Sequence, residues 1–313
     1  MQAQTGSRIR QIRQPRRPAL AGLAGMILAC RAFAGSVTLY PNADTSLFAN
    51  FPDNDLGASS SLVSGVNGSG FSSRALVRFD VANQIPSNAV IQSVALTMNV
   101  VTVPGGGGVA SVFDLRRVLL GWGEGAGTSN TGSPANAGEA TWNNRMHPST
   151  PWTVPGGAIS NDFSETLSAS MLISGLGSYT FNSTTQLVAD VQQWLLNPSA
   201  NFGWVLISES ENTAFTARRF GSREDAVNTP VLVVEYAVPA TTQIQWIKAV
   251  GAQIQFSFSA SAEQPYTVQY RDSLSSGNWL TLTNIAPQTT STNLIVTDPF
   301  PTNVQRFYRI GVF

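Results

Sequence analysis

Arg74-Ala75-Leu76-Val77-Arg78-Phe79-Asp80, RALVRFD in one-letter code, alternates along most of its length between apolar and charged side chains. Successive side chains of a β-strand point to opposite faces of its sheet, so the apolar residues at 75, 77 and 79 share one face. The two arginines lie on the other face, where they need carboxylates, a ligand or water. The stretch therefore predicts a half-buried strand whose apolar face looks toward a core.

Alternating segments on both sides of this stretch predict further antiparallel strands. They run at 37–40, 91–101, 112–120, 178–182, 203–207, 216–220 and 231–236, with a long polar loop predicted over 41–73. One helix interrupts them: Ser183 or Thr184 is its N-cap, the apolar residues at 187, 188, 191, 194 and 195 share one side, and Pro198 ends it. The pattern predicts an all-β, antiparallel jelly-roll β-sandwich with one short helix.

A second, smaller body is predicted after a linker at 238–242. Six short strands follow, at 244–249, 254–259, 266–272, 279–283, 292–296 and 306–311, separated by turns such as Ser275-Ser276-Gly277-Asn278. This spacing is typical of a small immunoglobulin-like or fibronectin-like β-sandwich. The predicted organisation is thus a leader at 1–34, a jelly-roll domain at 35–237 and a β-sandwich at 243–313.

The first 34 residues have the pattern of a secretory signal peptide. Five arginines between Arg8 and Arg17 precede the apolar run Ala19–Cys30, and Ala32-Phe33-Ala34 is an A-x-A cleavage site. Twelve apolar residues are too short to span a bilayer, so no membrane span is predicted. An alternative is a lipoprotein signal that anchors the chain through a lipid on Cys30. Cleavage after Ala34 leaves a secreted chain without cysteine, which no disulfide can stabilise.

Charge argues against a nucleic-acid partner. The formal net charge of the whole chain is zero, but six of its 18 basic residues lie within the first 34, where there is no acid. The remaining chain has 12 basic and 18 acidic residues, a net charge of −6. A nucleic-acid-binding protein would instead carry a basic patch or stripe.

Catalytic motifs are few. His147 is the single histidine, no Gly-x-Ser-x-Gly motif is present, and no His or Cys spacing suits zinc. The spacing of the acidic residues selects no glycosidase pair, which favours solvated loop acids over a lyase or hydrolase; the candidates are Glu124, Glu139, Asp162, Glu165, Glu209 and Glu211. We therefore expect no enzyme activity.

Three tryptophans in the loop-rich segment 121–155 are the candidate ligand contacts. Trp122, Trp142 and Trp152 offer flat faces on which sugar rings stack, and Arg117 and Arg145 would suit an acidic chain. A loop of this length without strands is uncommon unless it is functional. The alternative is that the tryptophans form a satellite core beneath the loop.

Other charged residues have a structural interpretation. Arg74, Arg78 and Arg223 either form a cationic face for a uronate-bearing glycan or pair internally with Glu224, Glu235 or Asp80. We favour internal pairing because they lie in strand-like segments, and Trp194 is expected in the core. The loop oxygens of Asn42, Asp44, Asp53 and Asp55 would suit a structural calcium ion, and the alternative is that they only form turns. No other cofactor is expected.

Residues 37–236 resemble the DNRLRE domain, also classed as carbohydrate-binding module family 96. The resemblance rests on several marks in order: Ala43-Asp44-Thr45, RALVRFD, Ala140-Thr141-Trp142-Asn143, Val191-x-x-Trp194, Gly203–Ile207, Phe220–Glu224 and Pro230–Tyr236. It implies an exported jelly-roll module of the kind often attached to polysaccharide-acting enzymes, some of which bind acidic polysaccharides such as alginate. No catalytic domain accompanies the module here. Residues 240–313 resemble the fibronectin-like C-terminal modules of bacterial exported proteins.

These observations predict a secreted, non-catalytic polysaccharide-binding protein, with acidic (uronate) glycans as the expected ligand. The alternative is a structural protein of the cell surface or extracellular matrix that mediates protein contacts. An exposed aromatic platform would favour glycan binding, and large flat apolar patches would favour protein contacts.

Overall fold

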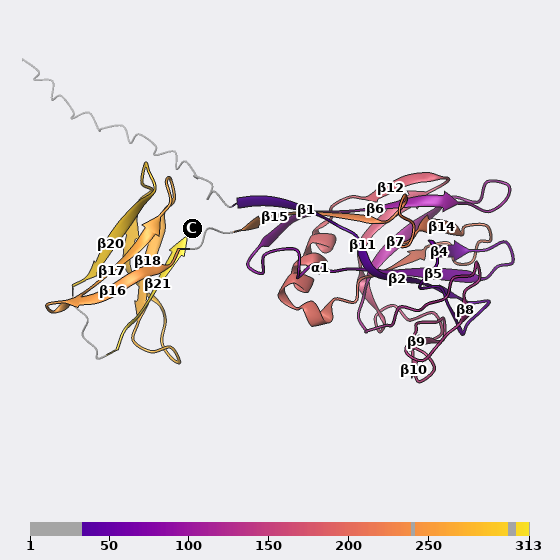
Figure 1. The fold of residues 1–313 in the computed structure, drawn as a ribbon, viewed down its shortest axis with the longest axis horizontal. Helices are drawn as coiled ribbons and strands as arrows, with labels where there is room; N and C mark the ends of the chain where they lie inside the picture. Colours follow the sequence, from indigo (N-terminus) through magenta and orange to yellow (C-terminus); the bar gives the residue numbers. More distant parts are fainter. Residues whose placement is uncertain (1–32, 239–241, 300–304, 313) are drawn as a thin grey trace, which may run out of the picture.

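The computed structural model describes residues 33–238, 242–299 and 305–312, and it is mostly β-structure with one short helix (Figure 1). The predicted all-β, antiparallel class is therefore confirmed. Residues 1–32 of the predicted leader at 1–34, with its Cys30 alternative, and residues 239–241 of the predicted linker lie outside the described residues, whereas Phe33 and Ala34 begin the first strand.

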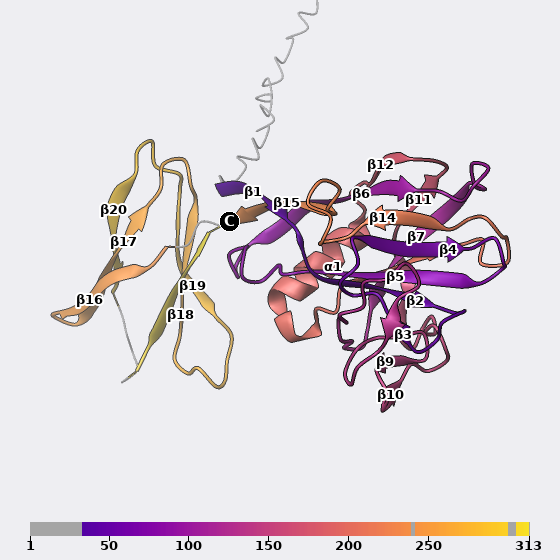
Figure 2. The same cartoon turned by 45° about the vertical axis from the view of Figure 1, so that its right-hand side comes forward.

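Residues 33–238 build one large antiparallel sheet that curls into a half-barrel (Figures 1 and 2). Its strand order is β1-β15-β6-β14-β4-β5-β13-β7-β11, with β12 paired to β6 and β2 paired to β5. The strands are β1 (Phe33–Leu39), β2 (Pro41–Phe48), β4 (Ser61–Val66), β5 (Ser72–Phe79), β6 (Val90–Thr102), β7 (Ser111–Val118), β11 (Phe163–Ile173), β12 (Gly177–Phe181), β13 (Trp204–Ser208), β14 (Arg218–Gly221) and β15 (Val231–Val238).

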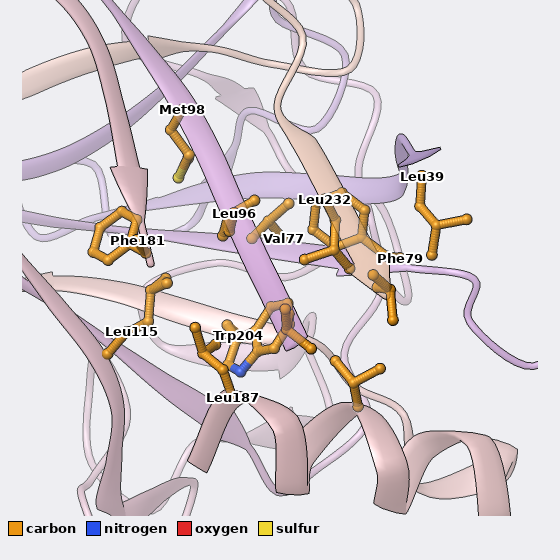
Figure 3. Close-up of a cluster of buried hydrophobic side chains, with 14 of the residues drawn as sticks. Leu39, Val77, Phe79, Leu96, Met98, Leu115, Phe181, Leu187, Trp204 and Leu232 are labelled. Atoms are coloured by element: carbon orange, nitrogen blue, oxygen red, sulfur yellow. The ribbon is translucent and has the colours of Figure 1, made fainter. Parts of the chain in front are cut away.

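The predicted strand lies at the centre of this sheet as β5, between β4 and β13. Ala75, Val77 and Phe79 are buried in the main core, as predicted. Figure 3 shows Val77 and Phe79 among side chains of β6, β13 and α1, including Trp204. The curled sheet thus closes around one apolar interior.

The opposite face of β5 is also covered, which corrects the expectation of a half-buried strand. Leu76 is fully buried in a second apolar cluster with Trp122, Trp152 and Phe163. The segment 119–163 supplies this cover and forms only short strands: β8 (Ser133–Pro134), which pairs with β3 (Asn54–Asp55), and the hairpin of β9 (Asn144–Met146) and β10 (Thr150–Pro151). Figures 1 and 2 both show β9 and β10 outside the curled sheet.

The helix α1 (Thr185–Leu196) forms where it is predicted. The Thr184 hydroxyl caps it by accepting a hydrogen bond of 3.0 Å from the Leu187 N–H, and Val191 and Trp194 are buried against the sheet. It packs against β6 and β11. A 3₁₀ turn, η1 (Pro198–Ala200), follows directly because proline cannot continue the helix.

Three strands contradict the sequence-based prediction. The predicted polar loop at 41–73 contains β2, whose polar side chains at 44–46 are fully buried, and β4. The strand β11 is absent from the prediction because its sequence FSETLSASMLI is rich in Ser, Thr and Glu and does not alternate cleanly. Its pairing with β7 also shifts register twice, which breaks the period of two.

Residues 244–312 form two small antiparallel sheets, and all six predicted strands are present. One sheet has the order β16-β17-β20 and the other β19-β18-β21; their strands are β16 (Ile244–Val250), β17 (Gln253–Ala260), β18 (Tyr266–Arg271), β19 (Leu280–Ile285), β20 (Thr292–Asp298) and β21 (Phe307–Val312). Phe256 and Phe258 of β17 share a core with Tyr266 and Val268 of β18, so the two sheets pack face to face. Within the described ranges, no helix is long and apolar enough to cross a membrane.

Candidate functional site

The candidate site is a cavity of about 300 Å³ on the outer face of the large sheet, near the ends of β4, β6 and β14. Its floor contains Phe48 and Val63, which are buried, and the half-exposed ring of Phe51 forms part of its rim. Polar residues complete the lining: Asn50, Asn67, Ser73, Thr102, Asn130, Thr131, Arg218 and Arg219. Apolar surface with a few polar groups is the usual make-up of a ligand site.

The alternation along β14 explains how two neighbouring arginines take different positions. Phe220 points into the main core, and Arg218, two residues away, shares its face and is fully buried. Arg219 takes the opposite face, where Val63 of the paired strand β4 also lies. Arg219 is therefore the arginine that the cavity presents to solvent.

Arg218 is held entirely by backbone carbonyl oxygens. Its two terminal nitrogens donate hydrogen bonds of 2.8–3.4 Å to the carbonyl groups of residues 109, 174, 215, 216 and 217. Its Nε atom is buried without a hydrogen-bond partner. Burial lowers the pKa of the Arg218 guanidinium, which carries its charge without a carboxylate within ion-pair distance in the described part of the chain.

Arg219 is likewise bound by uncharged groups. It donates hydrogen bonds to the Ser61 hydroxyl (3.0 Å) and the Asn130 carbonyl (2.7 Å), and burial lowers its pKa. Among the described residues no carboxylate forms an ion pair with it. Arg219, which pairs with no carboxylate in the described part of the chain, makes this cavity locally positive, although the body around it is acidic.

Two of the three candidate tryptophans cannot stack on a ligand. Trp122 and Trp152 are only 4% and 3% exposed, and each indole N–H donates to a backbone carbonyl, of Phe202 (2.8 Å) and Thr141 (2.9 Å) respectively. They belong to the second apolar cluster, so the satellite-core alternative describes them correctly. Trp142 is half-buried against the same cluster, and the guanidinium of Arg74 lies over its ring at 5.5 Å.

The two arginines predicted to bind a ligand beside these tryptophans also make internal contacts. Arg117 lies on the helix-facing side of β7, where its Nε is 3.4 Å from Asp190 of α1. Arg145 donates to the Gly121 carbonyl at 2.8 Å. The structure therefore does not bring the predicted ligand set together at one exposed surface.

The residues predicted to be structural do make internal contacts, with partly different partners. Arg74 pairs bidentately with Glu211 (2.7 and 2.8 Å), which was not among its predicted partners, and donates to two glycine carbonyls. Arg223 pairs with Glu224 and Glu124. The remaining contacts are a ring contact of Arg78 with Trp122, a turn hydrogen bond from Asn83 to Asp80, and a buried edge contact of Trp194 with Trp204.

The four oxygen-bearing residues predicted for calcium have separate partners. The Asn42 and Asp53 side chains accept hydrogen bonds from Arg78 and Asn143, whereas Asp44 and Asp55 are buried. No cluster of three or more His, Cys, Asp or Glu side chains suited to a metal ion occurs in the described ranges.

Asp44 is nevertheless in an unusual environment. Burial, with smaller contributions from Glu224 and Glu124, raises its pKa to about 8, although the Arg223 N–H donates to its Oδ2 at 2.8 Å. Its Oδ1 is buried without a hydrogen-bond partner. The carboxyl group is thus mostly protonated at neutral pH.

Asp55 and Glu139 form a second buried acidic pair, this one beneath the loop. Burial raises the pKa of Asp55, although the N–H groups of Gly57 and Gly127 donate to it. Burial alone would raise the pKa of Glu139 as well, but hydrogen bonds from Asn136 and Asp55 lower it overall. Asp55 accepts hydrogen bonds from the Gly57 and Gly127 N–H groups, and Glu139 accepts them from Asn136, so both carboxyl groups hold backbone of the loop segments in place.

Neither Arg218 nor Arg219 is among the candidate residues that the sequence pattern selects, and the cavity was not predicted. The sequence does contain one indication, a pair of neighbouring arginines in a predicted strand. Because side chains alternate along a strand, one of the two arginines must point inward. A buried guanidinium needs carboxylates or a set of carbonyl groups as hydrogen-bond partners. No family model matches the chain, and no curated protein matches it either.

Proposed function

We propose that this chain is a secreted, non-catalytic polysaccharide-binding protein whose ligand is an acidic, uronate-bearing glycan. The observation that carries the proposal is the cavity beside β14, where Arg219 lies in the wall and pairs with no carboxylate among residues 33–238, 242–299 and 305–312. A guanidinium group binds a carboxylate through two parallel hydrogen bonds, and asparagine amides hydrogen-bond sugar hydroxyls. The ring of Phe51 at the rim offers an apolar face for a sugar ring.

The proposal includes the finer description of both bodies. We take the first as a DNRLRE-type jelly roll, and the marks of that resemblance support this because RALVRFD and Gly203–Ile207 pair as β5 and β13. We take the second as a fibronectin type III-like sandwich, supported by its two facing three-stranded sheets. Export after cleavage at Ala34 is compatible with β1, since Gly35–Leu39 would remain paired with β15.

Affinity electrophoresis of residues 35–313 tests the function. We expect alginate and polygalacturonate in the gel to retard the protein more than a neutral glucan does. Arg219→Gln should weaken retardation by about tenfold or more, because a charge-assisted hydrogen-bonded pair contributes about 1.5–3 kcal/mol. Phe51→Ala should weaken it less. Lys248→Gln removes one charge from β16 of the other body and serves as the control.

Two results would refute the proposal. One is a mature chain that none of the three polysaccharides retards. The other refutes the cavity as the binding site: an Arg219→Gln variant that melts like the parent protein and is retarded to the same extent.

A further inference from the structure

A second group of unneutralised arginines lies in the C-terminal body, around Trp279. The guanidinium of Arg309 lies over the Trp279 ring at 4.4 Å, and that of Arg271 lies over the same ring at 5.2 Å. Gln269 is opposite Arg309 in the β18–β21 register and accepts a hydrogen bond of 2.8 Å from its Nε. Because Arg271 is two residues from Gln269, all these side chains share the outer face of one sheet.

The three arginines of this sheet differ in how they are neutralised. Arg306 pairs with Asp272 at 3.1 Å and with Asp298 at 2.7 Å. Arg271 donates its Nε to the Ser273 carbonyl, and within the described ranges neither it nor Arg309 has a carboxylate partner. Because both arginines donate through Nε, their terminal nitrogens are left for a ligand, and the Trp279 ring lies beneath both guanidinium groups.

A hollow of about 410 Å³, with Leu280 in its lining, lies beside these arginines, at the turn between β18 and β19. Its lining includes Arg271 together with the side chains of Ser273, Ser276 and Asn278. Asp272 also lines it but is paired with Arg306. Hydroxyl and amide groups next to a fixed guanidinium are suited to a sugar that carries an acidic group.

The distribution of charge favours a polyanion at this body. Residues 243–313 contain four basic and three acidic residues, a net charge of +1, whereas residues 35–242 contain eight basic and 15 acidic residues, a net charge of −7. A polyanion is therefore repelled by most of the first body and not by the second.

We propose that Arg271 and Arg309, braced by Trp279, form a second site for an acidic polysaccharide. This inference deepens the proposed function, since it assigns the C-terminal body a role in binding the same class of ligand. One polymer with repeated carboxylates can occupy both sites. Once the polymer is bound at one site, its effective concentration at the other site is high, which strengthens the overall binding.

The test uses residues 35–313 in gels that contain alginate at 50 mM and 300 mM salt. The double variant Arg271→Gln/Arg309→Gln should be retarded about tenfold less at low salt, since two charge-assisted contacts and the avidity are lost. Lys248→Gln, which removes a charge that lies over Trp246 on the other sheet, should leave retardation unchanged. A double variant that melts normally and binds like Lys248→Gln would overturn the inference.

Further measurements distinguish a failure of this inference from a failure of the proposed function. If Arg219→Gln has no effect while the double variant loses binding, the cavity proposal fails and the second site stands. Equal binding of alginate, single-stranded DNA and phosphatidylserine vesicles, lost in the same double variant, would overturn the glycan assignment in favour of a general anion site.

Discussion

At the scale of single residues, Asp44 gives the sharpest prediction. Its pKa is raised from 3.8 to about 8 by burial, so the folded protein holds a proton there that the unfolded chain releases. The stabilising contribution of this proton is complete below pH 3.8 and is lost as the pH rises toward 8. The variant Asp44→Asn has no titrating group at this position, so it does not lose this stabilisation as the pH rises. Its free energy of unfolding, relative to the parent, should therefore rise between pH 5 and pH 8 by up to about 1.4 kcal/mol per pH unit.

Urea denaturation of the mature chain at both pH values measures this difference. Asp53→Asn, an exposed acid on the neighbouring segment, is the charge-matched control. An Asp44→Asn variant with the same offset from the parent at pH 5 and pH 8 would show that this carboxyl group is not protonated in the fold.

Some residue roles follow from the sequence and others depend on distant partners. The periodicity of α1 identifies Trp194 as a core residue because its neighbours in the helix are close in sequence. In the sequence, Trp122 and Trp152 look like exposed aromatic residues of a ligand-binding loop. Only the hydrogen bonds from their indole groups to the carbonyl groups of residues 202 and 141 show that they are core residues. Those contacts, like the pairing of Arg74 with Glu211, join separate segments of the chain. The local sequence pattern does not specify which of these segments come into contact.

At the scale of elements, one carboxylate fixes α1 to the sheet. Asp190 is 1% exposed, accepts hydrogen bonds from Ser168 of β11 (2.6 Å) and the Trp204 indole of β13 (3.0 Å), and lies 3.4 Å from Arg117 of β7. Replacing it by alanine would leave a charge and two donors without their partner. We therefore expect Asp190→Ala to lower the free energy of unfolding by about 3–5 kcal/mol.

Chemical denaturation at pH 7 checks this value. Asp190→Asn keeps an acceptor for Trp204 and should cost less than the alanine variant. Glu165→Ala, at an exposed position of β11, should change stability by about 0.5 kcal/mol or less. A loss below about 1 kcal/mol in Asp190→Ala would mean that apolar packing alone holds the helix.

The strands were predictable where one face is apolar and the other polar. β6 and β15 follow that rule, and so does β18 of the second body. The sequence of β5 alternates in the same way, although its second face is also covered. β2 does not, because both of its faces are covered and its Asp, Thr and Ser side chains are satisfied inside. The residue before β13 shows a constraint of another kind: Gly203 has φ +74°, and a Cβ there would lie 2.1 Å from the Val77 carbonyl.

At the scale of the whole molecule, two separate cores predict two separate unfolding events. No strand of 33–238 pairs with a strand of 244–312 in the described chain, and each body has its own buried cluster. The second core is small, and domains of about 70 residues have little stability to spare. We expect calorimetry of residues 35–313 to show two transitions, with the second body unfolding at the lower temperature.

A matched pair of substitutions assigns the transitions. Val77 and Val268 are both buried, each in the core of one body, so truncation to alanine costs each body about 2 kcal/mol. Val268→Ala should lower only the first transition temperature and Val77→Ala only the second, because no shared packing transmits the loss. If either substitution shifts both transitions, or if the parent unfolds in one cooperative step, the two bodies are coupled. In that case the arginines of the second body would have to be treated as part of a single binding unit with the cavity of the first.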